Sequence, residues 1–163
     1  MRVWLTMLVT VAVVTGASTA FAGERLVAEF FPQRHIDLQG AWEMPRFTGD
    51  PEIDSRMVAR IREQELRLFI PPAFTSPPKQ VSIFLVLPAQ IPGMHSTGGF
   101  EMSWTTRGRF REGTVHPGER ALLFQGLVDA SVLAEFVGFT YVIDAREMIG
   151  TLRVEPVYEI ELN

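Results

Sequence analysis

Apolar and polar residues alternate with a period of two along three segments of the chain, residues 35–44, 100–111 and 151–162. Successive side chains of a β-strand point to opposite faces, so this alternation is typical of strands with one buried and one solvated face. Pro156 lies inside the third segment. Proline removes a backbone donor, so we expect the third segment to be an edge strand or a bulged one.

Three further runs indicate strands because β-branched and aromatic residues dominate them. Residues 81–87 and 136–143 are apolar at nearly every position, which predicts strands buried on both faces. Residues 119–128 are similar, and Gly126 within them predicts a bulge or a close backbone approach.

One segment has helical periodicity instead. Asp50 can cap a helix that has Pro51 at its first position, and Ile53, Met57 and Ile61 then share one helical face. We therefore expect a short helix near residues 51–64. A strand at 66–70 follows it.

The connections contain residues that break regular structure. Four prolines in residues 71–78 predict a loop, because each proline fixes φ and lacks a backbone donor. Residues 144–149 are expected to form one helical turn.

About 7–8 strands at short spacing, with one short helix near 51–64, indicate an all-β fold. The candidates are an antiparallel β-sandwich and a small β-barrel, and the strand pattern alone leaves both open. The tripeptide Gly40-Ala41-Trp42 resembles the opening motif of lipocalin-type barrels. That resemblance implies a barrel.

The N-terminal 22 residues have the three parts of a signal peptide. Arg2 supplies a positive charge, residues 3–14 are mostly apolar, and Ala20-Phe21-Ala22 ends the segment with small residues at the positions that a signal peptidase reads. We expect cleavage to leave residues 23–163 as a single all-β domain, periplasmic or secreted, with no membrane span. The alternative is an uncleaved membrane anchor, although this apolar run is short for a span of about 20 residues.

Composition excludes several classes of function. The chain has no cysteine, so it has no disulfide, no thiol nucleophile and no lipidated cysteine. Loss of Arg2 with the signal peptide changes the net charge from −4 to −5, and an acidic chain argues against a nucleic-acid partner. No serine-hydrolase elbow, zinc-protease helix or phosphate-binding loop is present. We therefore expect a binding or accessory domain with no catalytic residues, while a hydrolase built from two carboxylates remains an alternative.

Two kinds of ligand fit this expectation. A small apolar molecule could bind inside a barrel lined by Trp42 and Trp104. A protein partner could instead meet an edge strand, or a row of arginines predicted on one strand face at Arg107, Arg109 and Arg111. Alternatively, that row is a solvated face balanced by cross-strand glutamates such as those at positions 155, 159 and 161. A cavity behind Trp42 would favour the small ligand, and a filled core with an exposed apolar or arginine-lined face would favour the partner.

Copper is the one cofactor that the sequence suggests, as an alternative to none. Met94, His95 and Met102 supply thioether and imidazole groups that suit Cu(I), and Trp104 shares a strand face with Met102. The competing interpretation places Met102 and Trp104 in the core beside Phe100 and Phe110.

Overall fold

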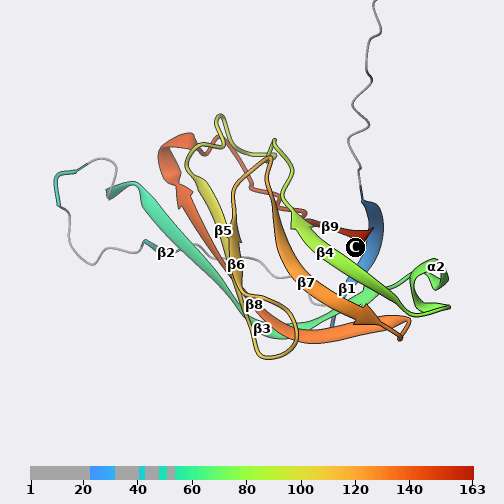
Figure 1. Cartoon of the computed structure of the whole chain (residues 1–163). Helices are drawn as coiled ribbons and strands as arrows, with labels where there is room; N and C mark the ends of the chain where they lie inside the picture. Colours follow the sequence, from blue (N-terminus) through green and yellow to red (C-terminus); the bar gives the residue numbers. More distant parts are fainter. Residues whose placement is uncertain (1–22, 32–40, 43–47, 51–53) are drawn as a thin grey trace, which may run out of the picture.

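The computed structural model describes residues 23–31, 41–42, 48–50 and 54–163 (Figure 1). Nearly every regular element in these residues is a strand. In chain order the elements are β1 (Glu24–Phe31), β2 (Ala41–Trp42), β3 (Arg56–Phe69), α2 (Pro72–Thr75), β4 (Lys79–Val86), β5 (Phe100–Thr106), β6 (Gly113–Val115), β7 (Arg120–Val128), β8 (Val132–Asp144), the 3-10 turn η1 (Ala145–Glu147) and β9 (Val157–Leu162).

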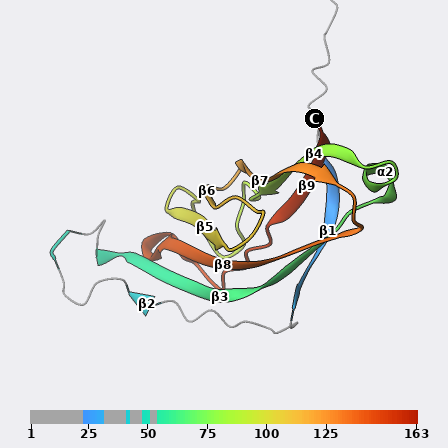
Figure 2. The ribbon, with the colours of Figure 1, turned by 60° about the horizontal axis from the view of Figure 1, so that its bottom comes forward.

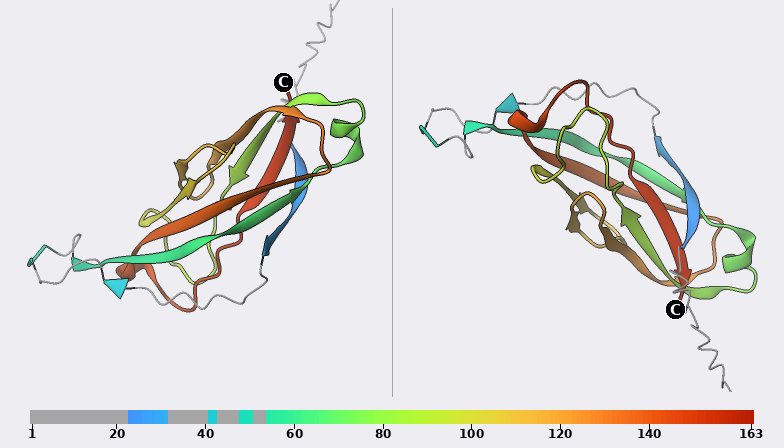
Figure 3. Two further views of the ribbon diagram at one scale, coloured as in Figure 1. Left: turned by 90° about the horizontal axis from the view of Figure 1, so that it is seen from below. Right: turned by 90° about the horizontal axis from the view of Figure 1, so that it is seen from above.

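The strands form one antiparallel sheet that curls into a nearly closed barrel (Figures 1 and 3). Their order is β6-β5-β8-β3-β1-β9-β4-β7, and β2 pairs with β3 beside this path. β6 and β7 end the order, and the backbone N–H of Arg111, just before β6, donates to the Leu123 carbonyl on β7 at 2.7 Å. The all-β prediction is confirmed, and the sheet has the form of a barrel.

β1 pairs with a different strand along each part of its length. Its first residues, Glu24 to Leu26, pair with β9, whereas residues 27–31 pair with β3. Figure 2 shows β3, the strand that pairs with the end of β1, side by side with β8.

The helix predicted near residues 51–64 is wrong from Arg56 onward, because β3 occupies residues 56–69. β8 pairs with β3 along its whole length, and this pairing supplies the backbone partners that a helix would have found within itself. Met57 and Ile61 are four residues apart, a spacing that fits one face of a helix and equally one face of a strand. Residues 51–53 lie outside the described residues.

A bulge in β3 explains why its pattern is not a clean alternation. The register with β8 shifts by one residue between Ile61 and Gln64. Before the bulge, Ala59 lies in the core, and after it Leu66 and Leu68 do. The extra residue moves the positions that face the core from odd to even numbers.

Several strand boundaries differ from the predictions. β5 ends at Thr106, so residues 107–111 are not part of a strand. β9 starts just after Pro156 and lies between β1 and β4, so it is not an edge strand. The bulge in β7 falls at Leu123, where the register with β4 shifts, and not at Gly126.

Other predictions hold. η1 is the helical turn expected within residues 144–149, and the proline-rich stretch is a connection that contains only the short helix α2. Of the segment 35–44, only Ala41 and Trp42 are described, and they form β2. Among the described residues, no helix is long and apolar enough to cross a membrane.

Large apolar side chains fill the inside of the barrel. They come from every long strand, and Phe110 adds a ring from the β5–β6 loop, where it packs edge-on to Phe124 with centroids 6.3 Å apart. Burying a side chain of this size stabilises the fold by about 1.5–3 kcal/mol. The largest fully buried side chains are Phe100, Leu66, Leu68, Ile83, Leu85, Leu87, Met102, Leu123, Leu133 and Ile160.

Candidate functional site

Trp104 is part of the core. Its side chain is 2% exposed, and its indole Nε1–H donates to the Arg111 carbonyl at 2.7 Å. Gly113 lies opposite Trp104 on β6, so close that a Cβ atom there would be 2.7 Å from the indole ring. The ring is thus enclosed by its own strand neighbours. The Trp42 side chain lies outside the described residues.

The three candidate copper ligands occupy different environments. Met102 is fully buried inside the barrel, and Met94 packs against the same core from the β4–β5 connection. The next residue, His95, is exposed, and its backbone N–H donates to the Glu147 carbonyl at 2.7 Å. The described residues contain no group of three histidines or carboxylates that could hold a metal ion. Met102 lies inside the barrel and His95 at its surface, and copper binding by these residues stays a prediction.

The predicted row of arginines on one strand face is wrong, because these residues lie in the loop between β5 and β6. A loop does not hold alternate side chains in one line, and each of these arginines contacts a different strand. Arg107 Nε donates to Glu63 Oε1 (2.8 Å), Arg109 Nε lies 3.4 Å from Glu135 Oε1, and Arg111 Nη2 donates to Gln125 Oε1 (3.3 Å).

These contacts tie the loop to β3, β8 and β7 at one end of the barrel. The glutamates that balance Arg107 and Arg109 are therefore at positions 63 and 135, and not at 155, 159 or 161. Glu161 forms its ion pair with Arg120 instead.

A cavity of about 330 Å³ lies at the opposite end of the barrel, where β5 begins and β8 ends. Charges of both signs line it, together with the backbone of a glycine pair. The lining residues that carry these groups are Arg56, Arg146, Glu101, Asp144, His116, Gly98 and Gly99.

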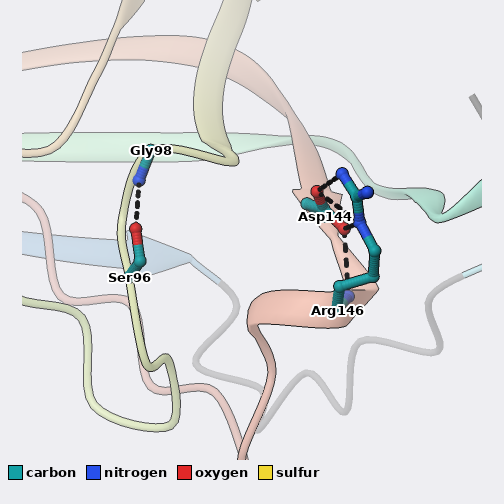
Figure 4. A network of polar contacts seen from close by, with 4 residues as sticks. All are labelled: Ser96, Gly98, Asp144 and Arg146. Carbon is teal, nitrogen blue, oxygen red and sulfur yellow. Dashed lines mark hydrogen bonds and ion pairs between the residues drawn. The ribbon is translucent and has the colours of Figure 1, made fainter. Parts of the chain in front are cut away.

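Asp144 in this cavity accepts several hydrogen bonds from Arg146 (Figure 4). The Arg146 Nε donates to Oδ1 at 3.0 Å, its Nη2 donates to Oδ2 at 2.6 Å, and its backbone N–H donates to Oδ1 at 3.0 Å. The hydrogen bonds from the Arg146 side chain are the main cause that lowers the pKa of Asp144 to about 2. So acidic a carboxyl is a poor proton acceptor at neutral pH.

Two further hydrogen bonds lie at this rim. The Gly99 carbonyl accepts the Asp144 N–H at 2.7 Å, and the Gly98 N–H donates to Ser96 Oγ at 3.3 Å (Figure 4). The bond between Gly99 and Asp144 joins the loop before β5 to the end of β8, and the bond between Gly98 and Ser96 lies within that loop.

A second cavity of about 310 Å³ lies at the same end, beside the segment that follows β4 and the one that precedes β9. Leu87, Ile91 and Val154 line its apolar part. Both cavities are lined by strand ends and loops and not by the inward faces of mid-strand residues. Neither matches the interior site expected for a small apolar ligand.

The outer face of three neighbouring strands carries exposed apolar side chains. Val27 and Phe31 on β1 are 64% and 54% exposed, and Phe136 on β8 is 55% exposed. The register places Val27 opposite Phe69 and Phe69 opposite Val132, so one apolar row crosses β1, β3 and β8. We call this surface the β1–β3–β8 face, and its apolar members are Val27, Phe31, Phe69, Val132, Ala134 and Phe136.

Charged residues occupy the centre of the β1–β3–β8 face. Glu29 on β1 lies opposite Arg67 on β3. Arg67 Nη2 also lies 2.9 Å from Glu65 Oε2, and its guanidinium carbon is 4.7 Å from the centre of the Phe31 ring. The arginine is thus held flat on the sheet by an ion pair and a cation–π contact.

No sequence pattern predicted this face. Residues 136–143 were expected to be buried on both sides, whereas Phe136 is exposed. An uninterrupted apolar run indicates that a strand has no polar face, but it does not tell whether anything covers the outer one. Val27 and Phe31 lie before residue 35, where the first predicted strand begins, so no strand was predicted for them.

Comparison with protein-family models, with curated proteins and with solved structures finds no match.

Proposed function

We propose that this protein is an exported, non-enzymatic module that binds another protein through the β1–β3–β8 face. The observation that carries the proposal is the exposure of Val27 and Phe31 on β1 and of Phe136 on β8, the two strands that flank β3 in one sheet. Contiguous exposed apolar surface on a soluble domain typically marks an interaction site.

The packed barrel interior supports a protein partner over a small apolar ligand. Trp104 and Met102, which could have lined an internal site, are enclosed by neighbouring side chains. A partner needs no cavity, because strands of one sheet face can pack against an apolar surface of another molecule.

Export is proposed from residues 1–22 alone. Their charge, apolar run and small-residue end fit a cleaved signal peptide, and the first strand begins at Glu24, just beyond the expected cleavage site. The binding module would then act in the periplasm or outside the cell.

Site-specific photo-crosslinking tests the proposal. A photoreactive phenylalanine analogue replaces Phe136, and in a control variant it replaces Gln125, an exposed residue on β7 away from the face. We expect a protein adduct from position 136 and none from position 125. The adduct should disappear when Phe31→Ser is added to the chain. An absence of adducts at position 136, or equal adducts at both positions, would rule the proposal out.

A further inference from the structure

The side of β1 that faces β9 is open over the second half of the strand. β9 pairs only with residues 24–26 of β1, and among the described residues no strand pairs with this side of residues 27–31. The side chains that point into the barrel change at the same place. Leu26 is buried, whereas Ala28 and Phe30 are only partly buried. The sheet is therefore accessible from this side just beyond Leu26.

Pro156 explains why the pairing between β1 and β9 stops. Leu26 pairs with Tyr158. Continued by two residues, the same register would place Ala28 opposite Pro156. Proline has no backbone N–H, so it cannot give the hydrogen bond that such a pair exchanges. β9 accordingly begins one residue later, at Val157.

The backbone of Ala28 and Phe30 points to the open side. Just after β3, the Ile70 N–H donates at 2.8 Å to the carbonyl of Ser131, just before β8. Successive residues of a strand alternate sides, so the odd-numbered residues at the end of β3 bond with the odd-numbered residues of β1 opposite them. The N–H and C=O groups of Ala28 and Phe30 therefore point away from β3. We call these groups the open β1 edge.

Unpaired N–H and C=O groups along a strand are a template for another extended chain. A segment added at the open β1 edge would form main-chain hydrogen bonds with Ala28 and Phe30. Side chains on its outer face would lie beside Val27 and Phe31, which are exposed members of the β1–β3–β8 face. The open β1 edge and the apolar side chains thus offer one partner two kinds of contact.

We infer that the partner of the β1–β3–β8 face is an extended segment of another protein, which adds to the sheet as a strand along β1. The inference rests on the proposed function, because it names the kind of partner that binds the proposed face. The backbone supplies the pairing, and the side chains on the outer face supply the specificity.

Glu29 argues against a second copy of β1 as the added strand. Two antiparallel copies of β1 that use both residues of the open β1 edge must place Ala28 of one copy opposite Phe30 of the other. Glu29 would then face the same glutamate of the second copy. Like charges directly opposite one another on neighbouring strands are destabilising, so a segment of a different protein fits this edge better.

The same position predicts the chemistry of the partner segment. Glu29 lies opposite Arg67, and Glu65 forms an ion pair with the same arginine at 2.9 Å. Two glutamates thus share one arginine, which leaves a negative charge in excess beside the open β1 edge. We expect the partner segment to place a basic residue opposite Glu29. Apolar residues two positions away on either side would lie beside Val27 and Phe31.

Hydrogen exchange on the purified protein tests whether the edge is open. The backbone amides of Ala28 and Phe30 should exchange quickly, whereas those of Glu29 and Phe31, which bond with β3, should be protected. The alternate residues of one strand serve as the matched control. Protection of Ala28 and Phe30 in the isolated protein would show that another part of this chain already covers the edge, and it would overturn the inference.

A proline substitution tests strand addition itself. A photoreactive phenylalanine analogue at Phe31, beside the open β1 edge, reports the partner as a crosslinked adduct. Ala28→Pro removes the N–H that faces the partner and leaves the pairing with β3 intact. Ala28→Ser also changes the side chain but keeps the N–H, so its adduct should be roughly tenfold stronger than that of Ala28→Pro. Thermal unfolding verifies that both variants are folded.

A charge reversal tests the predicted basic residue of the partner. Glu29→Lys should weaken the adduct at position 31 roughly fivefold, because it replaces an attraction across neighbouring strands by a repulsion. Glu155→Lys, a reversal at an exposed residue off the face, is the control and should leave the adduct unchanged.

An adduct at position 31 that is equally strong in Ala28→Pro and Ala28→Ser would overturn the inference, as would one that Glu29→Lys leaves unchanged. The proposed function would stand in both cases, provided that position 136 still yields an adduct with a different protein. An adduct with the mass of two copies of this chain would also overturn the inference. If neither position 31 nor position 136 yields an adduct, the inference and the proposed function both fall.

Discussion

Gly99 packs so closely against Asp144 that a Cβ atom added to the glycine would lie 2.4 Å from the Cβ of the aspartate. Gly99→Ala should therefore push β5 and β8 apart at their hydrogen-bonded ends and lower the free energy of unfolding by about 1–3 kcal/mol. Gly98→Ala is the matched control, because its Cβ would meet nothing nearer than Ser96 Oγ at 3.6 Å. Urea unfolding measures both variants. Equal stability of the two would contradict the packing argument.

The ion pair between Asp144 and Arg146 predicts a loss of stability in acid. The folded-state pKa of Asp144, about 2, is below its ordinary value of 3.8. The carboxylate therefore stabilises the fold above about pH 4, and this contribution disappears as the pH falls toward 2. Asp144→Asn should lower the free energy of unfolding by about 1 kcal/mol at neutral pH, and the difference from the unmodified protein should vanish near pH 2.

Glu155→Gln serves as the control for this pH series. Glu155 lies 3.9 Å from Arg153, and both side chains are more than three-quarters exposed. Its removal should leave the stability unchanged at every pH, because solvent screens such a pair. A pH profile of Asp144→Asn parallel to that of the unmodified protein would show that Asp144 is not the group responsible.

Tyr158 carries a buried hydroxyl that has no hydrogen-bond partner among the described residues. Burial raises the pKa of this group far above its ordinary value. Tyr158→Phe removes a polar group that makes no compensating bond, so the free energy of unfolding should stay the same or rise by up to about 1 kcal/mol.

Trp104→Phe provides the contrast for Tyr158→Phe. It deletes a donor that is bonded to the Arg111 carbonyl at 2.7 Å, and it should destabilise the protein by about 1–3 kcal/mol. Chemical denaturation of both variants gives the comparison. If Tyr158→Phe costs as much as Trp104→Phe, the tyrosine hydroxyl has a bonding role that its surroundings do not reveal.

The signal-peptide proposal predicts a specific N-terminus. Protein recovered after export from the cell should begin at Gly23, three residues after Ala20, and intact-mass spectrometry measures this directly. A chain that keeps residues 3–14 and sediments with membranes would show that the segment is an anchor.

Local patterns predicted the all-β class correctly, because one side of each strand must be buried and side chains alternate along a strand. They failed at residues 56–64, where Met57 and Ile61 fit a helix and a strand equally well. The bulge between Ile61 and Gln64 also moved the core-facing positions from odd to even numbers. Which structure formed depended on β8, more than 60 residues further along the chain.

For the candidate site residues, too, the sequence predicted the local structure only in part, and distant contacts decided the rest. Trp104 and Met102 were correctly placed in a strand, yet only their neighbours across the barrel decided that they form core. Arg107, Arg109 and Arg111 alternate in the sequence, but β5 ends before them and each contacts a different element.

The amino-acid sequence by itself determined that the chain forms amphipathic strands, since hydrophobic periodicity is a local property. The tertiary structure alone decided which strands are neighbours, that the barrel interior is filled, and that Val27, Phe31 and Phe136 share an exposed face with Glu29 and Arg67 at its centre. Register between distant strands depends on long-range backbone pairing and packing, and no local pattern carries that information.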